Sequence, residues 1–216
     1  MCGRFFIIGD RSIFAISDLF RQLQLKDIQR FNISPVSKAP IILQGKNGLE
    51  VTEAIWWLIP HWSKTGKPDM RFPSFNARAE TIDTSKLFAP CFKTHRCLIP
   101  ASGFYEWKDK HPLCIRMKNE QPMFFGGVYS VWKDAVSFSI ITTAANRLMS
   151  EFHTRMPVIL PEKNFEKWLD PNYDDIESLK TLLIPYSDKE MIVYHVSNYV
   201  SNARNQGKEC LEPLKE

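Results

Sequence analysis

The sequence predicts a mixed α+β fold with an antiparallel, β-barrel-like core and a few flanking helices. Short apolar segments far outnumber helical ones, and the two types do not alternate one for one along the chain. Fourteen prolines against nine glycines favour turns and short strands over long helices. No repeat, low-complexity stretch or long linker divides the 216 residues, so we assign residues 1–216 to one domain.

Nine segments have the length and apolar content of strands. The turn Gly45–Gly48 joins two of them into a predicted hairpin. In chain order the expected strands are Met1–Ile8, Ala39–Leu43, Leu49–Leu58, Cys97–Pro100, Gly103–Lys108, Leu113–Met117, Met123–Trp132, Ser137–Thr142 and Met191–Val196.

Three segments are predicted to be helical. Ser12–Leu25 carries apolar residues at helical spacing, and Ser12 is a suitable N-cap. Phe165–Leu169 and Ile176–Leu183 are the other two helices that we expect.

The composition is that of an ordinary globular protein, with 44% hydrophobic and 24% charged residues. A formal charge of +4 permits an anionic partner without requiring one. Arg4, Asp10 and Arg11 interrupt the start of the chain, so we expect no secretory leader. No run of eighteen apolar residues occurs, which excludes a membrane-spanning helix. We therefore expect a soluble, intracellular (cytoplasmic) protein.

Metal and phosphate-loop chemistry have no support in the sequence. The cysteines are odd in number, lack a Cys-x-x-Cys pair, and lie at positions 2, 91, 97, 114 and 210. His61, His95 and His111 do not have metal-ligand spacing. No phosphate-binding glycine loop and no Gly-x-Ser-x-Gly elbow is present. We expect neither a metal nor an organic cofactor.

Cys2 directly follows the initiator methionine. If Met1 is removed, the chain begins with an α-amine and a thiol on adjacent carbons, a 1,2-aminothiol. This group condenses with an aldehyde to an imine, which the sulfur closes into a thiazolidine. The reference α-amino pKa is about 7.7–8.0, against about 10.4 for lysine, so part of the amine is a free nucleophile near pH 7. The alternative is a cysteine without chemical role.

Residues 74–81 form a polar run with small residues interposed. If this run is extended, Asn76, Arg78 and Glu80 share one side. An amide and a guanidinium beside small residues suit an oxyanion or a phosphate. The alternative is a half-buried strand with a solvated polar face.

Two further segments carry titratable side chains. Glu106 lies among aromatic residues, where burial would raise its pKa and make it a general acid near neutrality; alternatively it points into water. His153 and Arg155 are two residues apart and suit proton transfer and phosphate binding. A lone histidine is also commonly a hydrogen-bonded structural residue. Trp62 belongs to a tryptophan-rich segment that is mostly core, although an exposed tryptophan there could stack on an unpaired base.

Taken together, these segments resemble the SRAP family (SOS response-associated peptidases), abasic-site processing proteins that crosslink to abasic sites in single-stranded DNA. The matching segments occur in the same order as in the family. Their joint occurrence behind an N-terminal cysteine is specific to this family. The matching segments are Met1–Phe5, Arg30–Pro35, Phe75–Thr81, Gly103–Trp107, Thr142–Asn146, His153–Pro157 and Val196–Ser197.

The resemblance implies catalytic roles for four residues. Cys2 would be the nucleophile that joins the ring-opened abasic aldehyde through amine and sulfur. Asn76 would orient the terminal amine or the sugar oxygen. Glu106 would be the general acid and base for ring opening and imine chemistry, and His153 a second proton carrier. The thiazolidine would shield the lesion from strand cleavage.

The resemblance also implies a DNA-binding surface. Arg4, Arg78 and Arg155 would hold phosphates around the lesion, and Asn32 and Pro35 match the loop that flanks the DNA channel. Some relatives carry a second tryptophan as a wedge where this chain has Ser63–Lys64, so the wedge is either missing here or supplied by Trp62. The expected partner is single-stranded DNA with an abasic site, and no obligate protein partner is implied.

Two other functions remain open at this stage. An N-terminal nucleophile beside a glutamate could cleave an amide, which would make the protein a peptidase that removes residues ahead of Cys2. The other open function is that of a non-catalytic module that binds single-stranded DNA, in which Cys2 has no chemical role. A lyase activity lies close to the first function, because an imine at an abasic site invites β-elimination.

Overall fold

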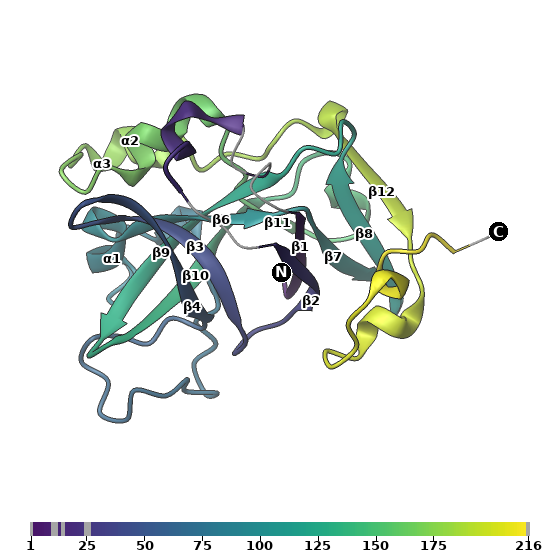
Figure 1. Ribbon diagram of the computed structural model, residues 1–216, viewed down its shortest axis with the longest axis horizontal. Coiled ribbons are helices and arrows are strands. Elements are labelled where there is room, and N and C mark those ends of the chain that lie inside the picture. The colour runs from purple at the N-terminus through teal and green to yellow at the C-terminus, as the bar shows by residue number, and fades with distance from the viewer. Residues whose placement is uncertain (1, 10–12, 14–15, 24–26, 215–216) are drawn as a thin grey trace.

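The computed structural model describes residues 2–9, 13, 16–23 and 27–214. Five strands close into a barrel in the order β4-β3-β6-β9-β10, and β10 returns to pair with β4 (Figure 1). The barrel strands are β3 (Lys38–Gly45), β4 (Gly48–Trp56), β6 (Arg96–Ala101), β9 (Met123–Trp132) and β10 (Ala135–Ala144). The pairing is antiparallel throughout except at the closure, where β10 runs parallel to β4. The closing contact is short, since it pairs only Ile55 and Trp56 of β4 with Ser137 and Phe138 of β10.

Two three-residue strands extend the barrel along β10. They are β5 (Asn76–Arg78), which pairs in parallel, and β11 (Arg155–Pro157), which pairs antiparallel. A long connection, residues 57–75, joins β4 to β5 and extends away from the barrel at the lower left of Figure 1.

A second, fully antiparallel sheet lies beside the barrel. Its strands, in spatial order, are β12 (Met191–His195), β8 (His111–Met117), β7 (Gly103–Lys108), β1 (Arg4–Gly9) and β2 (Ile28–Ile33). The hairpin between β7 and β8 has positive φ at Asp109 and Lys110, the backbone that a tight two-residue turn requires.

Helices are few and short. The α-helices are α1 (Ala89–Thr94), α2 (Phe165–Leu169) and α3 (Ile176–Lys180). In the part of the chain that the structure describes, the 3-10 helices are η2 (Asp18–Phe20), η3 (Ala79–Thr81), η4 (Met149–Glu151), η5 (Glu162–Asn164), η6 (Asp188–Glu190), η7 (Asn198–Ser201) and η8 (Lys208–Cys210). Within the described residues, no helix is long and apolar enough to cross a membrane.

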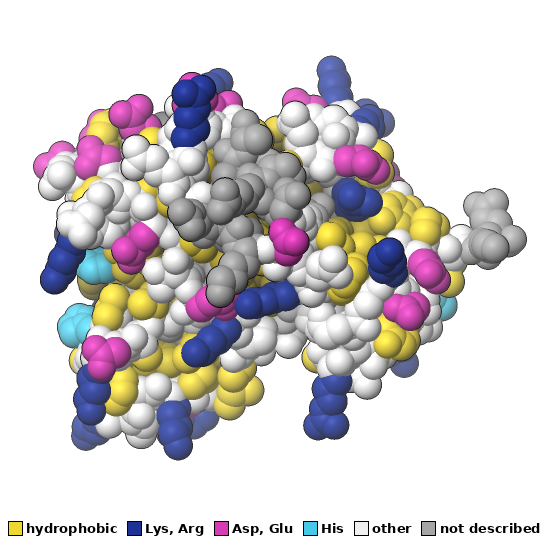
Figure 2. Space-filling model, viewed as in Figure 1, with side chains coloured by type: hydrophobic (Ala, Val, Ile, Leu, Met, Phe, Trp, Pro, Cys, Tyr) yellow, Lys and Arg dark blue, Asp and Glu magenta, His cyan; other side chains and the backbone are white. Residues whose placement is uncertain are grey.

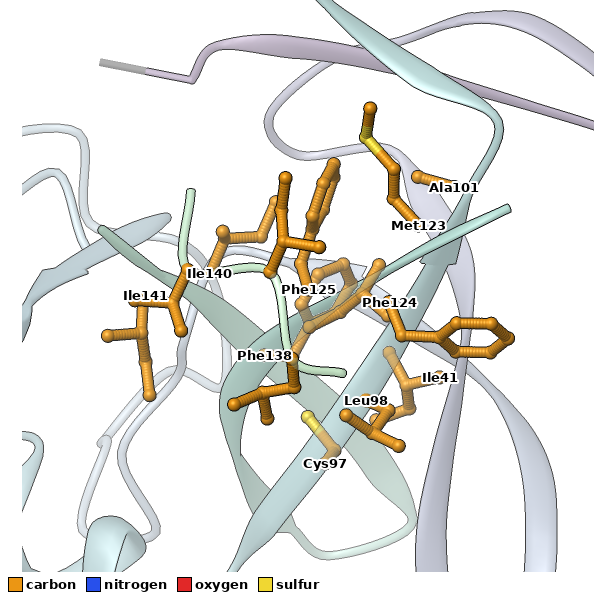
Figure 3. Close-up of a cluster of buried hydrophobic side chains, with 14 of the residues drawn as sticks. Ile41, Cys97, Leu98, Ala101, Met123, Phe124, Phe125, Phe138, Ile140 and Ile141 are labelled. Atoms are coloured by element: carbon orange, nitrogen blue, oxygen red, sulfur yellow. The ribbon is translucent and has the colours of Figure 1, made fainter. Parts of the chain in front are cut away.

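Buried hydrophobic side chains from the barrel strands form a cluster (Figure 3). The labelled residues in that view come from β3, β6, β9 and β10, and they include Phe124, Phe125 and Phe138. Phe5 from β1 joins this core, with its ring 5.0 Å from Trp56 and 6.0 Å from Phe125. Aromatic pairs at these separations stabilise beyond the area they bury.

Strand β1 lies between two hydrophobic clusters. Phe5 and Ile7 belong to the large cluster that includes the barrel interior, whereas Phe6 belongs to a smaller cluster. Side chains alternate across a strand, so β1 serves both clusters at once. The smaller cluster consists of Phe6, Phe31, Tyr105, Cys114, Val196, Val200 and Cys210. The start of the chain is therefore fixed from both faces.

Most of the predicted elements are confirmed, and the barrel-like α+β architecture with them. The strands β7 and β9 and the helix α2 have the predicted bounds, and the other predicted strands differ by a few residues at their ends. The elements that were not predicted from the sequence include Ile28–Ile33, Asn76–Arg78, Ala89–Thr94 and Arg155–Pro157.

The predicted helix Ser12–Leu25 is wrong in its described part. Ser17 has an extended backbone, with φ −142° and ψ 136°, and its side chain accepts a hydrogen bond from the Leu19 N–H to start the short helix η2. Phe20 is buried against Phe124 and Phe165. The helical spacing thus reflects turns that pack apolar residues on the sheet. The proposed cap, Ser12, lies outside the described residues.

Candidate active site

Cys2 and Asn76 are joined directly. The Asn76 side-chain N–H donates a 2.8 Å hydrogen bond to the Cys2 carbonyl oxygen. Asn76 opens β5, which is fixed on β10 by the parallel pairing of Ile140 with Asn76. The Asn76 Oδ1 atom is buried and accepts no hydrogen bond from any described residue. It is therefore an acceptor available to a group that enters the site.

Glu106 lies on β7, the strand next to β1. The pairing of Arg4 with Tyr105, continued by one residue, places Gly3 opposite Glu106. Phe104 faces the large cluster, and alternation puts the Glu106 side chain on the same side. Glu106 is only 4% exposed. This burial raises the pKa of the Glu106 carboxyl, while the positive charges of the amino terminus and of His153 oppose the rise.

His153 approaches from the loop between η4 and β11. Its backbone N–H donates to the Met149 carbonyl oxygen at 2.9 Å. Asn146 holds the start of this loop, because its Oδ1 accepts from the Met149 N–H at 2.8 Å and its Nδ2 donates to the Tyr186 carbonyl at 2.8 Å. The charge of His153 acts on Glu106, so the two side chains belong to one site.

The Cys2 thiol is fully buried in the chain that begins at Met1. Burial, and secondly the charge of Glu106, raise the pKa of the thiol well above its usual value. The thiol is therefore neutral near pH 7, and its use as a nucleophile needs a base at hand. The structure brings Cys2, Asn76, Glu106 and His153 together, as the sequence analysis expected, although their chemical roles stay predictions.

Arg4 and Asn32 hold the C-terminal segment. The Arg4 guanidinium donates to Asn32 Oδ1 at 2.7 Å and to the Val200 and Ser201 carbonyl oxygens at 2.7 and 3.2 Å. It also lies 5.6 Å from the ring centroid of Trp107. Asn32 is buried and its Nδ2 donates to three carbonyl oxygens of the same segment, those of Val200, Asn202 and Asn205. Both residues therefore have a structural task beside any contact with DNA.

Gln206 is a contributor that the sequence analysis missed. Its Oε1 accepts from the backbone N–H groups of Phe31 and Asn32 at 3.0 and 3.2 Å, and its Nε2 donates to the Asn32 carbonyl at 3.0 Å. This amide takes the place of a neighbouring strand at the edge of β2. No local sequence pattern predicts this contact, because 174 residues separate Gln206 from Asn32.

Arg78 and Arg155 differ in their surroundings. Arg78 is exposed, and no hydrogen bond or ion pair joins its side chain to another described residue. Arg155 has only 15% of its side chain exposed and forms a bidentate ion pair with Glu80, at 2.5 and 2.9 Å. Of the two, Arg78 is the one whose guanidinium is available to a phosphate.

Pro35 and Trp62 lie on two connections that border the barrel. Pro35 precedes Val36, which is 46% exposed and has a positive φ of 74°, a strained conformation for a β-branched residue. Trp62 is 52% exposed, on the connection from β4 to β5, beside a pocket of about 630 Å³ that Phe72 also lines. On the face shown in Figure 2, basic and acidic side chains are interspersed rather than gathered in one band.

The family model described as "SOS response associated peptidase (SRAP)" matches residues 1–203. The chain belongs to the SRAP family. Among its relatives, the abasic site processing protein YoqW of Bacillus subtilis is 32% identical, over 98% of this chain and 99% of that protein. The abasic site processing protein YedK of Escherichia coli is 28% identical, over 99% of this chain and 100% of that protein.

A solved structure has the same fold. The crystal structure of a protein from Bacteroides thetaiotaomicron is 25% identical and covers 99% of this SRAP chain and 100% of its own, with a TM-score of 0.80. This likeness supports the architecture rather than the chemistry.

Proposed function

We propose that this SRAP protein processes abasic sites in single-stranded DNA by forming a covalent thiazolidine through Cys2 after removal of Met1. The observation that carries the proposal is the assembly of a thiol, an amide, a buried carboxyl and an imidazole around the start of β1. Relatives that match nearly the whole chain are abasic site processing proteins. An abasic site in its open form is an aldehyde, the electrophile that a 1,2-aminothiol traps.

The first step joins the Cys2 amine to the aldehyde carbon. The carbinolamine that results must lose its hydroxyl as water to become a protonated imine (iminium ion), and that departure needs a proton. Glu106 can supply the proton, because burial raises the pKa of its carboxyl and so favours the protonated form. Asn76 holds the Cys2 carbonyl and so fixes the direction in which the amine points.

The second step closes the ring. The neutral Cys2 thiol gives its proton to a base, and the Glu106 carboxylate left by the first step is suited to take it. The sulfur then adds to the imine carbon and the nitrogen electrons return to nitrogen, which completes the thiazolidine. One water leaves overall, and Glu106 ends in its starting protonation state. His153 would serve as the second proton carrier.

Binding of the strand would use groups around this centre. Arg78 is exposed and suited to a phosphate oxygen, and Trp62 is exposed enough to stack on a base. Because the lesion has no base, recognition would depend on backbone contacts and stacking rather than on base edges. Consumption of the imine would suppress β-elimination and so protect the strand.

Intact-mass spectrometry of the protein incubated with an abasic oligonucleotide tests the proposal. A thiazolidine or imine adduct has the mass of the Met1-free chain plus the oligonucleotide, less one water. Resistance to borohydride separates the thiazolidine from the imine. An adduct on the chain that still carries Met1, or none on the Met1-free chain, would contradict the proposal.

A further inference from the structure

His153 is held through the backbone of Arg155. The Arg155 N–H donates a 2.9 Å hydrogen bond to the His153 Nδ1 atom. A nitrogen that accepts this bond carries no proton, so the bond favours the neutral tautomer with its proton on Nε2. The same Nδ1 atom lies 3.2 Å from the Arg155 carbonyl oxygen, a contact that the other tautomer would use, so the position of the Arg155 backbone bears on both the orientation and the tautomer of the imidazole.

The Arg155 side chain is in turn held by Glu80. Both terminal nitrogens of its guanidinium bind the Glu80 carboxylate, at 2.5 and 2.9 Å, and one also donates to the Thr142 carbonyl oxygen at 2.5 Å. Strand β11 has only three residues, so few ladder hydrogen bonds fix Arg155 on β10. The side-chain anchor on Glu80 ties the start of this short strand to the helix η3.

The Glu80–Arg155 pair differs from an ordinary surface ion pair. Arg30 and Glu53 form an equally bidentate pair, at 2.9 and 3.0 Å, but 37% of the Arg30 side chain is exposed against 15% for Arg155. Pairs in water contribute little, whereas a mostly buried guanidinium depends on its partners. The Arg155 hydrogen bonds also hold the pKa of Glu80 below its usual value, so this carboxyl stays ionised near neutrality.

We propose that Glu80 is a positioning residue for His153, acting through Arg155. The effect on reaction rate rests on the proposed function, but the effect on the His153 ring does not. More than half of the Glu80 side chain is exposed. Among the described residues, no hydrogen bond joins it to Cys2 or to Asn76. Its influence would thus reach the site through the chain Glu80, Arg155, His153.

The test compares Glu80→Gln with the control Glu53→Gln, which breaks the Arg30 pair in the same way. The ring ¹⁵N resonances of His153, assigned with His153→Gln, report the tautomer directly. We expect Glu80→Gln to move them from the Nε2–H pattern toward a mixture, and adduct formation with abasic single-stranded DNA to slow by about tenfold. Glu80→Asp, which keeps the charge, should restore part of both signals, and Glu53→Gln should change neither.

A double-mutant comparison shows whether the effect passes through Arg155. If it does, Glu80→Gln causes no further loss once Arg155→Met is in place. Thermal unfolding of each variant verifies that the proteins are folded. Unchanged His153 resonances in folded Glu80→Gln, a faster reaction of that variant, or an additive loss in the double variant would each overturn the proposal. A wild-type protein without adduct would refute the proposed function, while the resonances would still decide the role of Glu80.

Discussion

The Asn76 side-chain amide donates a 2.8 Å hydrogen bond to the carbonyl oxygen of Cys2. The bond joins residues 74 positions apart and fixes the first described residue of the chain to β5. The Asn76 Oδ1 atom is buried and has no hydrogen-bond partner among the described residues. It can therefore accept a hydrogen bond from a donor group of the substrate or from the mature amine. The Asn76 side chain therefore holds Cys2, the proposed nucleophile, and presents a second contact to a group that approaches it.

Replacement of Asn76 by alanine should slow adduct formation by about tenfold, the equivalent of about 1.4 kcal/mol in the barrier. The loss follows from a Cys2 amine that is no longer fixed in direction. Single-turnover rates with saturating DNA measure it. Ser74→Ala, two residues earlier, removes a hydroxyl that donates to the Leu58 carbonyl away from Cys2 and serves as the control. Equal rates for Asn76→Ala and wild type would remove Asn76 from the mechanism.

Glu106→Gln should abolish most of the reaction while stabilising the protein at neutral and alkaline pH. The folded state raises the pKa of this carboxyl above the ordinary 4.5, so it binds the proton more tightly than the unfolded chain does. Stability is therefore lost as pH rises from about 4.5 through the folded pKa, and a glutamine avoids that loss. Thermal unfolding at pH 4 and pH 8 should show Tm values that are closer at pH 4 and favour Glu106→Gln at pH 8. The opposite order at pH 8 would contradict a buried, destabilising carboxylate.

The buried guanidinium of Arg96 predicts a large cost for Arg96→Lys. Arg96 is 2% exposed and donates to the carbonyl oxygens of Phe92, Lys93, Trp168, Asp170 and Tyr173, which ties α1 to α2. A lysine has three donors on one atom and cannot reach this spread of acceptors. We expect a loss of about 2–4 kcal/mol in the free energy of unfolding, measured by denaturant titration. Arg71→Lys, on an exposed pair with Asp69, should leave the free energy of unfolding almost unchanged.

Trp62→Ala should weaken binding of single-stranded DNA by about 1–3 kcal/mol, with or without the lesion. The side chain is 52% exposed, so its removal leaves the core unchanged. Fluorescence anisotropy with intact and abasic strands of equal length measures both affinities. Ile184→Ala, at a position that is 62% exposed beyond α3, is the control. A loss confined to the abasic strand would instead place Trp62 at the lesion, and no loss would exclude stacking there.

Short apolar runs made the strands predictable, because each one needs only its own residues to be recognised. The helix predicted at 12–25 is wrong in its described part, where Phe20 lies in the short helix η2 and packs on Phe124 and Phe165. The helical spacing of apolar residues therefore indicated correctly that Phe20 is buried, but it predicted the wrong backbone conformation.

The residues of the candidate site were named from the resemblance of their segments to a family, but their connections could not be predicted. An arginine in a sequence gives no sign of whether it binds a phosphate or the protein itself. Arg155 proved to be held by Glu80, 75 positions away, and Arg4 by carbonyl oxygens near the C-terminus. The prediction that Asn76, Arg78 and Glu80 share one side of a strand holds only to Arg78, where β5 ends and η3 begins. Such contacts depend on the closed barrel and are fixed only by the fold.

The most direct test of the account is a denaturing gel of purified protein with a single-stranded oligonucleotide that carries one abasic site. The lanes beside it hold an intact strand, Cys2→Ala and Cys2→Ser. The account predicts a heat-stable shifted band for wild type with the abasic strand alone, none for Cys2→Ala, and more strand cleavage or a less stable band for Cys2→Ser, which lacks the sulfur. A Cys2→Ala band as strong as that of wild type, or no band from protein confirmed to begin at Cys2, would contradict it.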